Sequence, residues 1–139
     1  MIRDTFEFEK LIRKKNDAGF GVFLADPTGR WRDAEFLGSV QYAKNREDIA
    51  TLLWAFLSDV EFREKSLAAF SGYTPAPWTL FIDSPEYIRR DEKLSVLFLR
   101  VEPLFFRHEL KFSLYVYDPR PISDEIRDGF AKNGFARYL

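Results

Sequence analysis

Residues 78–117 decide the fold that this sequence predicts, and they read WTLFIDSPEYIRRDEKLSVLFLRVEPLFFRHELKFSLYVY. Three runs in this stretch, 78–83, 94–101 and 108–117, are rich in the β-branched and aromatic residues that are typical of strands. Only a short helical turn, at about residues 84–90, is expected between them. Because strands that follow one another without a long crossover helix usually pair antiparallel, this stretch predicts an antiparallel sheet.

The apolar pattern predicts different places for these strands in the sheet. Both alternating sets of positions are apolar in residues 94–101, as in a central strand that is covered on both faces. In residues 108–117 apolar and polar side chains alternate, which predicts a strand with one buried face. Such a strand is also a candidate edge of the sheet, at which two copies of the chain would pair as a homodimer.

Capping residues and apolar spacing predict the helices on either side of this stretch. Residues 4–16 form the first expected helix, because an aspartate that can cap it precedes a periodic apolar face. Two consecutive helices are expected to begin near Asn45, to break near Ser58 and to end before Gly72. A last helix is expected at residues 123–134.

The remaining segment, residues 20–42, predicts a hairpin, since the turn sequence DPTG interrupts its apolar runs. Its glycine and proline are typical of a reversal of chain direction. Together the expected elements predict one α+β domain over residues 1–139, with a mostly antiparallel sheet of about five strands and three to four helices.

The composition excludes several kinds of chemistry. The 139 residues include no cysteine, which excludes a disulfide framework, an iron–sulfur cluster, a cysteine-coordinated zinc site and a cysteine nucleophile. One histidine, His108, is too few for an all-histidine metal site within one chain. The 21 basic and 22 acidic residues leave a net charge of -1, which provides no general attraction for nucleic acid or for an anionic membrane. No cofactor is expected.

The chain also lacks the sequence signals of export and of membrane insertion. Its first ten residues, MIRDTFEFEK, contain acidic residues where a secretory signal needs a basic start and an apolar run. The longest stretch without charge, residues 66–82, contains one glycine and two prolines and is shorter than the roughly 20 apolar residues of a spanning helix. The sequence therefore predicts a cytoplasmic protein.

A binding surface is expected in residues 71–91, where amphipathic side chains typical of recognition surfaces are concentrated. The candidate contact residues are Tyr73, Trp78, Tyr87, Arg89 and Arg90. They favour a non-catalytic protein that binds and occludes a macromolecular partner, in the manner of an immunity protein or an inhibitor. Single-stranded nucleic acid is a less favoured partner for the same side chains, because the chain is nearly neutral.

A structural role is the alternative for these residues. Trp78 and Tyr87 would then close one end of the core, and the two arginines would pair with Asp91 and Glu92.

A metal-dependent nuclease or phosphodiesterase is the main alternative function. Asp83 could hold Mg²⁺ together with Glu109, and Lys111 could assist the attacking water. This arrangement requires the carboxylates to converge on one cation. His108 is more simply a strand residue than a catalytic base, because no serine is placed near it by the pattern.

A small-ligand carrier is the third alternative, since 15 phenylalanines could line an apolar cavity. Their spacing fits the inner faces of the expected helices and strands, which favours a packed core. The segment Gly19-Phe20-Gly21 precedes a strand and does not link a strand to a helix, so it does not predict a phosphate-binding loop.

Overall fold

Four parallel strands form the centre of the computed structural model, which describes residues 2–118. Their order across the sheet is β2-β1-β3-β4, and all three neighbouring pairs run in the same direction. The strands are β1 (Gly21–Ala25), β2 (Gln41–Ala43), β3 (Trp78–Asp83) and β4 (Phe112–Tyr117). The prediction of a mostly antiparallel sheet of about five strands is therefore wrong.

The main cause of this difference is that residues 94–101 belong to a helix, α4 (Glu92–Val101). The Asp91 carboxylate begins this helix by accepting hydrogen bonds from the backbone N–H groups of Lys93 and Leu94, both at 3.0 Å. The buried residues of α4 are Leu94, Leu97, Phe98 and Val101, which follow helical spacing. Because a helix now connects β3 to β4, these two strands run parallel.

The predicted hairpin over residues 20–42 is also wrong. β1 and β2 are parallel, and a connection that contains the 3₁₀ helix η1 (Glu35–Ser39) carries the chain between them. The DPTG turn therefore begins a crossover connection and does not reverse the chain within one hairpin.

The second long helix, α2 (Arg46–Ala69), is continuous over 24 residues. The Asn45 side chain caps it by accepting a hydrogen bond from the N–H of Asp48 at 2.8 Å, as the sequence predicts. The predicted break near Ser58 does not occur. The N-cap preference of serine did not end the helix, because buried residues continue on its inner face as far as Ser66.

The first helix is confirmed as α1 (Thr5–Asp17), with Asp4 as its cap. The short turn after β3 is α3 (Pro85–Arg90), and α4 is followed by the 3₁₀ helices η2 (Glu102–Phe106) and η3 (His108–Leu110). Because η3 occupies residues 108–110, β4 begins later than predicted. The helix expected at residues 123–134 lies outside the described residues.

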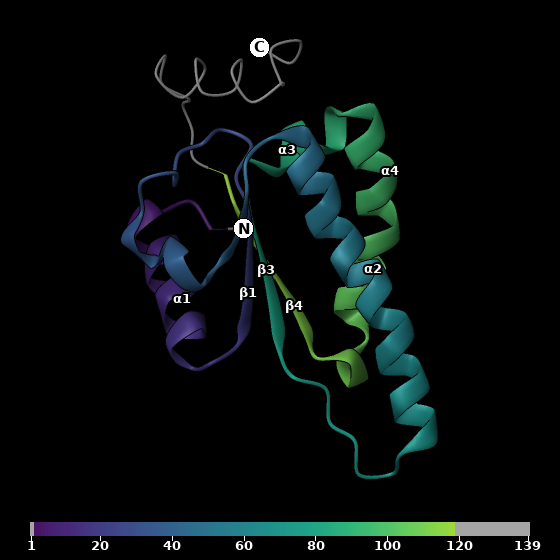
Figure 1. Ribbon diagram of the computed structural model, residues 1–139. Helices are drawn as coiled ribbons and strands as arrows, with labels where there is room; N and C mark the ends of the chain where they lie inside the picture. The colour runs from purple at the N-terminus through teal and green to yellow at the C-terminus, as the bar shows by residue number, and fades with distance from the viewer. Residues whose placement is uncertain (1, 119–139) are drawn as a thin grey trace.

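Helices cover both faces of the sheet (Figure 1), so two apolar cores exist. α1 and η1 pack on one face, where Phe8 and Trp31 meet Phe81 and Tyr117. α2, α3 and α4 pack on the other face. Strands buried on both faces explain the nearly continuous apolar runs of β1 and β3.

The strand order places a topological switch point between β1 and β3. The chain leaves β1 toward β2 on one side and leaves β3 toward β4 on the other. In open parallel sheets, ligands bind in the crevice at the carboxyl ends of the strands at such a point. This crevice is therefore the first place to look for a functional site.

No helix within residues 2–118 combines the length and the apolar character needed to cross a membrane.

Candidate functional site

Two buried aspartates lie at the carboxyl ends of the central strands. Asp26 follows β1 and Asp83 ends β3, and both residues have 0% exposure. The sequence predicted Asp26 only as the first residue of the DPTG turn, and Asp83 only as a candidate metal ligand. The parallel pairing of β1 with β3 is what brings their carboxyl ends to the same edge.

The chain itself supplies four hydrogen bonds to the Asp26 carboxylate. Oδ1 accepts from the Thr28 hydroxyl at 3.0 Å and from the Arg30 N–H at 3.2 Å. Oδ2 accepts from the Trp31 N–H at 2.8 Å and from the Tyr42 hydroxyl at 2.7 Å. The loop after β1 is thereby folded back over the end of its own strand.

Asp83 is held by the same loop. Its Oδ2 accepts from Arg30 Nε at 2.9 Å and from Trp31 Nε1 at 2.7 Å, and its Oδ1 accepts from the Ser84 hydroxyl at 2.7 Å. Arg30 and Trp31 therefore connect the two carboxylates. Gly29 allows this path, because its φ of 71° lies in the left-handed region that favours glycine.

Burial raises the pKa of both carboxyl groups, because removal from water penalises the charged form. The pKa of Asp83 rises to about 6, mainly through burial and then through the negative charge of Asp26, while Arg30 acts in the opposite direction. Hydrogen bonds from Trp31 and Tyr42 oppose the rise at Asp26. Burial and the adjacent Asp26 also raise the pKa of the Tyr42 hydroxyl.

This network fills the crevice with the protein's own side chains. Each carboxylate oxygen already accepts at least one hydrogen bond from the chain, and the Arg30 and Trp31 side chains occupy the space between the strand ends. Within residues 2–118 no three histidine, aspartate or glutamate side chains gather in a way that could hold a metal ion. The arrangement is that of a buried polar network, in which Arg30 Nη2 has no hydrogen-bond partner among the described residues.

The residues of the nuclease alternative do not converge. Asp83 lies at the carboxyl end of β3, whereas Glu109 and Lys111 precede β4 at its amino end. Trp78 pairs with Phe112 in the ladder, so Asp83 lies about five strand residues, or about 17 Å, from that level. These three side chains therefore cannot share one cation. His108 is exposed and lies at the same amino end.

The predicted contact residues fall at the two ends of the sheet. Tyr73 precedes β3 and Trp78 begins it, whereas Tyr87, Arg89 and Arg90 belong to α3, beyond its carboxyl end. Figure 1 shows this separation along β3. One compact contact centre formed by all five residues is therefore not present, and binding by either group stays a prediction.

The arginines of α3 have partners other than those expected. Arg89 lies 3.7 Å from the Glu102 carboxylate and 5.6 Å from the centre of the Phe98 ring. Arg90 pairs with Glu86 at 2.6 Å. Asp91 instead pairs with Arg46 at 2.5 Å, which links the first turns of α2 and α4.

Trp78 packs into the core at the amino end of the sheet. Its ring lies 4.7 Å from that of Phe23 and 5.4 Å from that of Phe56. The Arg63 guanidinium lies over its other side at 4.9 Å. A Cβ atom at Gly21 would approach the Trp78 ring to 2.6 Å, so only glycine leaves room for it there.

An exposed apolar surface lies on the outer side of α2 and α4. Trp54 is 45% exposed and Leu99 is 70% exposed, and Val96 lies one helical turn before Leu99. The Arg100 guanidinium lies 5.1 Å from the centre of the Trp54 ring and so connects the two helices. We call Trp54, Val96, Leu99 and Arg100 the α2–α4 surface.

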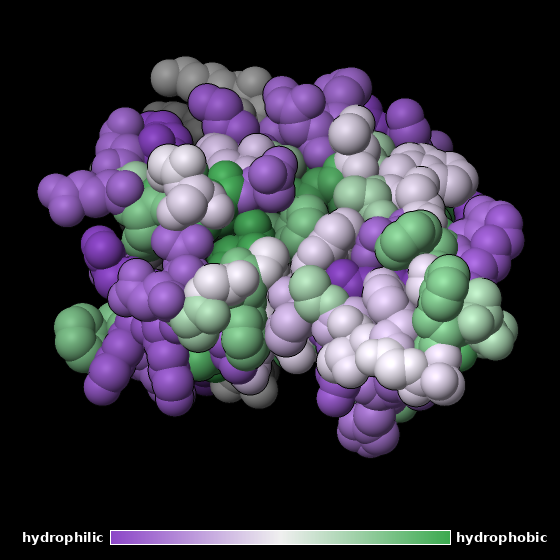
Figure 2. Space-filling view, turned by 60° about the horizontal axis from the view of Figure 1, so that its bottom comes forward, coloured by the Kyte–Doolittle hydropathy of each residue, from purple (hydrophilic) through white to green (hydrophobic). Residues whose placement is uncertain are grey.

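In Figure 2 hydrophobic residues lie at the centre and on the left of the visible face as well as on the right, the side on which Figure 1 shows these two helices. The sequence contained a signal for the α2–α4 surface, namely apolar residues on the outer face of α4. That signal was hidden because residues 94–101 were interpreted as a strand.

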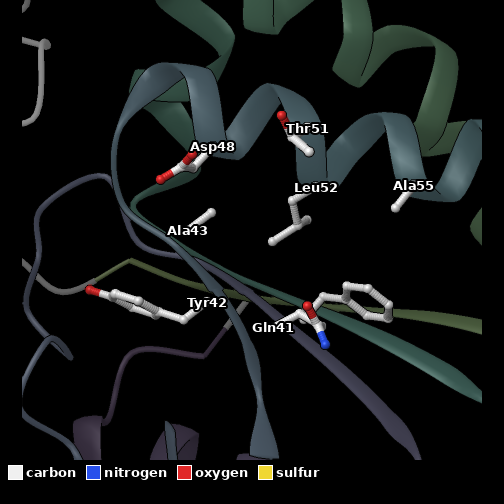
Figure 3. Close-up of a pocket in the computed structure, with 8 residues that line it drawn as sticks. Gln41, Tyr42, Ala43, Asp48, Thr51, Leu52 and Ala55 are labelled. Atoms are coloured by element: carbon white, nitrogen blue, oxygen red, sulfur yellow. The ribbon is translucent and has the colours of Figure 1, made fainter. Parts of the chain in front are cut away.

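A groove of about 240 Å³ lies between β2 and the first turns of α2 (Figure 3). Phe23, Ala43, Leu52 and Ala55 supply its apolar lining, and Gln41, Asp48 and Thr51 supply polar groups. Only one phenylalanine lines it, so it is not the phenylalanine-lined cavity expected of a small-ligand carrier.

Comparisons with known proteins show the fold alone. No protein-family model and no curated protein matches the chain. The structure is similar to that of the pCW3 conjugation coupling protein TcpA in its monomer form with ATPγS, with a TM-score of 0.50 and 13% identity over 84% of this chain. It is also similar to a structure described as an ATPase, with a TM-score of 0.51 and 16% identity over 86% of this chain.

The chain spans less than half the length of both structures, 39% of TcpA and 45% of the ATPase. ATP phosphates are commonly held by a glycine-rich loop that joins a strand to a helix N-terminus. In this chain β1 is followed by the sequence DPTG and then by η1, so this loop has neither the sequence nor the helix. The resemblance therefore concerns the parallel sheet and its flanking helices.

Proposed function

We propose that this chain is a non-catalytic protein-binding domain that occludes a macromolecular partner through its α2–α4 surface. The exposure of Trp54, Val96 and Leu99 on two packed helices supports this proposal. Contiguous apolar groups with a tryptophan and an arginine are the composition of interaction hot spots. The carboxyl-end network supports a role without catalysis, since a substrate would have to displace Arg30 and Trp31 to reach Asp26 and Asp83.

The arginines of α3 extend this proposal to the rim of the surface. Arg89 lies 5.6 Å from the centre of the Phe98 ring and pairs with Glu102, which follows Leu99 by three residues, so it lies beside the C-terminal end of α4. Rim charges contribute less to affinity than buried apolar anchors. Arg89→Ala is therefore expected to weaken partner binding less than Trp54→Ala does.

The cellular setting belongs to the same proposal. We infer a cytoplasmic site of action, because cysteine is absent. An immunity protein or an inhibitor of an intracellular enzyme would act there.

The test compares two surface variants of the tagged full chain. Leu99→Asp places a charge in the α2–α4 surface, and Phe6→Asp makes the same kind of change at a 73% exposed residue of α1, on the opposite face of the sheet. Each chain is used to capture proteins from a cell lysate. We then purify the proteins that the wild type and Phe6→Asp retain but Leu99→Asp does not. Leu99→Asp is expected to raise their dissociation constant at least about tenfold, or about 1.4 kcal/mol. Equal retention by all three chains would remove this surface as the contact centre.

A further inference from the structure

A second binding surface is built from the edge of the sheet and the groove beside it. β2 is an edge strand, and its register with β1 pairs Phe23 with Gln41 and Ala25 with Ala43. The N–H of Asp26 donates to the carbonyl of Ala43 at 2.8 Å, so Ala43 faces β1. Since successive residues of a strand direct their backbone groups to opposite sides, those of Tyr42 face away from the sheet.

Tyr42 therefore presents one free donor and one free acceptor. In the register with β1 its backbone N–H and C=O point away from the sheet, and outside the strand ladder they form no hydrogen bond with another described residue. Its side chain is fixed, because its hydroxyl donates to the Asp26 carboxylate at 2.7 Å. An added strand can form two main-chain hydrogen bonds with such a residue without any movement of the sheet.

The groove lies where an added strand would place one of its side chains. Figure 3 shows Gln41, Tyr42 and Ala43 along β2, with Asp48, Thr51, Leu52 and Ala55 on α2 facing them across the groove. Side chains of a strand alternate between the two faces of a sheet. A strand added to β2 would thus direct every second side chain toward α2, and the apolar lining selects an apolar one.

One charged side chain, that of Asp48, is part of the lining of the groove. Glu47 precedes Asp48, and neither carboxylate forms an ion pair with a residue in the described part of the chain. The Asp48 carboxylate accepts from the Asn45 amide at 3.0 Å and lies in the first turn of α2, so a neutral donor and the helix dipole stabilise it in place of a cationic side chain. Charge complementarity at Asp48 selects a basic residue in the bound segment.

We propose that this groove binds an extended segment of a partner protein, which adds to the free edge of β2, places an apolar side chain in the groove and places a lysine or arginine beside Asp48. The binding mode is β-strand addition, in which main-chain hydrogen bonds give the orientation and the groove selects the side chain. This surface lies on the β2 side of α2, whereas Trp54 faces α4. It is therefore independent of the α2–α4 surface.

The test uses defined peptides with blocked ends and the full chain. One peptide contains a leucine flanked by arginine within a threonine-rich extended sequence, and its matched partner carries glutamate in place of arginine. Binding is followed by titration calorimetry and by the shift of backbone amide signals. We expect the basic peptide to bind at least about fivefold more tightly than the acidic one and to shift the Tyr42 amide.

Two variants and their controls locate the site. Ala55→Phe fills the groove and is expected to weaken binding of the basic peptide at least about tenfold. Ala68→Phe, at an exposed position about 140° around α2 from Ala55, should leave binding unchanged. Asp48→Asn is expected to lower the affinity for the same peptide about fivefold. Glu92→Gln, in the first turn of α4, should leave this affinity unchanged. Circular dichroism and thermal unfolding of each variant establish that it is folded.

Other outcomes would overturn the proposal. Equal affinity for the two peptides, absence of binding at millimolar concentration, or amide shifts at α4 instead of β2 would each do so. A concentration-dependent dimer that hides the Tyr42 amide would assign this edge to a second copy of the chain. Because Leu99→Asp leaves the groove unchanged, loss of peptide binding and loss of the α2–α4 partner can be distinguished.

Discussion

The two ends of the parallel sheet are closed by side chains of opposite charge. At the carboxyl end, Asp26 and Asp83 are buried and share Arg30. At the amino end the buried group is Arg63, which is 2% exposed and lies between the rings of Trp78 and Phe112. Both ends are rich in hydrogen bonds, but only the carboxyl end contains two like charges.

This difference determines how each end is stabilised. Arg63 pairs with Asp59 and donates to the Leu110 carbonyl at 2.6 Å, so its single charge is compensated by one carboxylate and two aromatic rings. Asp26 and Asp83 depend largely on neutral donors, and their mutual repulsion remains. The carboxyl end should therefore respond to loss of a partner and to pH more strongly than the amino end.

Removal of a carboxylate from the carboxyl end should have the largest effect on stability. Asp83→Ala leaves the Arg30 guanidinium and the indole N–H of Trp31 without their acceptor in a buried site. We expect the free energy of unfolding to fall by about 3–5 kcal/mol, measured by urea denaturation.

Asp33→Ala is the matched control, because Asp33 is an aspartate of the same loop whose side chain is 93% exposed. Its expected change is within about 0.5 kcal/mol. A similar loss in both variants would show that the buried network does not hold the loop against β3.

Substitution of the buried charge at the amino end should lower stability less than substitution at the carboxyl end. Arg63→Ala removes the guanidinium but leaves Asp59 partly exposed to water, so we expect a loss of about 2–3 kcal/mol in urea denaturation. Arg63→Met keeps an unbranched apolar stem between the two rings and should recover part of this loss. A greater loss for Arg63→Ala than for Asp83→Ala would contradict the comparison of the two ends.

The sequence was informative about elements with local signals. Asp4 and Asn45 begin α1 and α2 as predicted, because a cap and the apolar face that follows it lie within a few residues. Residues 94–101 were assigned wrongly, because a short apolar run satisfies the periods of a strand and of a helix. The discriminating signal was Asp91, a capping residue placed directly before the helix.

The candidate sites depend on contacts between residues that are distant in sequence. Asp26 and Asp83 are joined only by the parallel pairing of β1 with β3, and no spacing in the sequence relates them. The groove at Tyr42 and the α2–α4 surface likewise require the order of the strands and helices to be known. The assignment of residues 94–101 to a strand concealed the α2–α4 surface, and the hairpin expected at residues 20–42 concealed the parallel edge strand beside the groove.

The pH dependence of stability should separate the two ends further. The pKa of Asp83 is about 6 in the folded protein, above the 3.8 of an unperturbed aspartate, so between these values the folded state binds more protons than the unfolded state. Stability contributed by this group is therefore present at low pH and lost as pH rises toward 6. We expect the contribution of Asp83 to the free energy of unfolding to be roughly 1–2 kcal/mol greater at pH 5 than at pH 7.

Asp83→Asn is the matched variant for this measurement, because it keeps the shape of the side chain and cannot ionise. The difference between the wild type and Asp83→Asn in thermal unfolding from pH 5 to pH 7 isolates the contribution of this carboxyl group. Parallel pH profiles for the two chains would show that Asp83 does not titrate in this range.

The smallest effect is expected near the amino end, at Thr79, the second residue of β3. Its hydroxyl is buried and has no hydrogen-bond partner among the described residues, unlike the Thr28 hydroxyl, which donates to Asp26 and accepts from the Arg30 N–H. Thr79→Val should leave stability unchanged or increase it by up to about 1 kcal/mol, since no hydrogen bond is lost. The same substitution at Thr28 should cost about 1–2 kcal/mol, because it leaves a buried carboxylate with one donor fewer. Equal losses at both positions in urea denaturation would mean that the hydrogen bonds of Thr28 at the carboxyl end contribute no more to stability than the unpaired hydroxyl of Thr79 near the amino end.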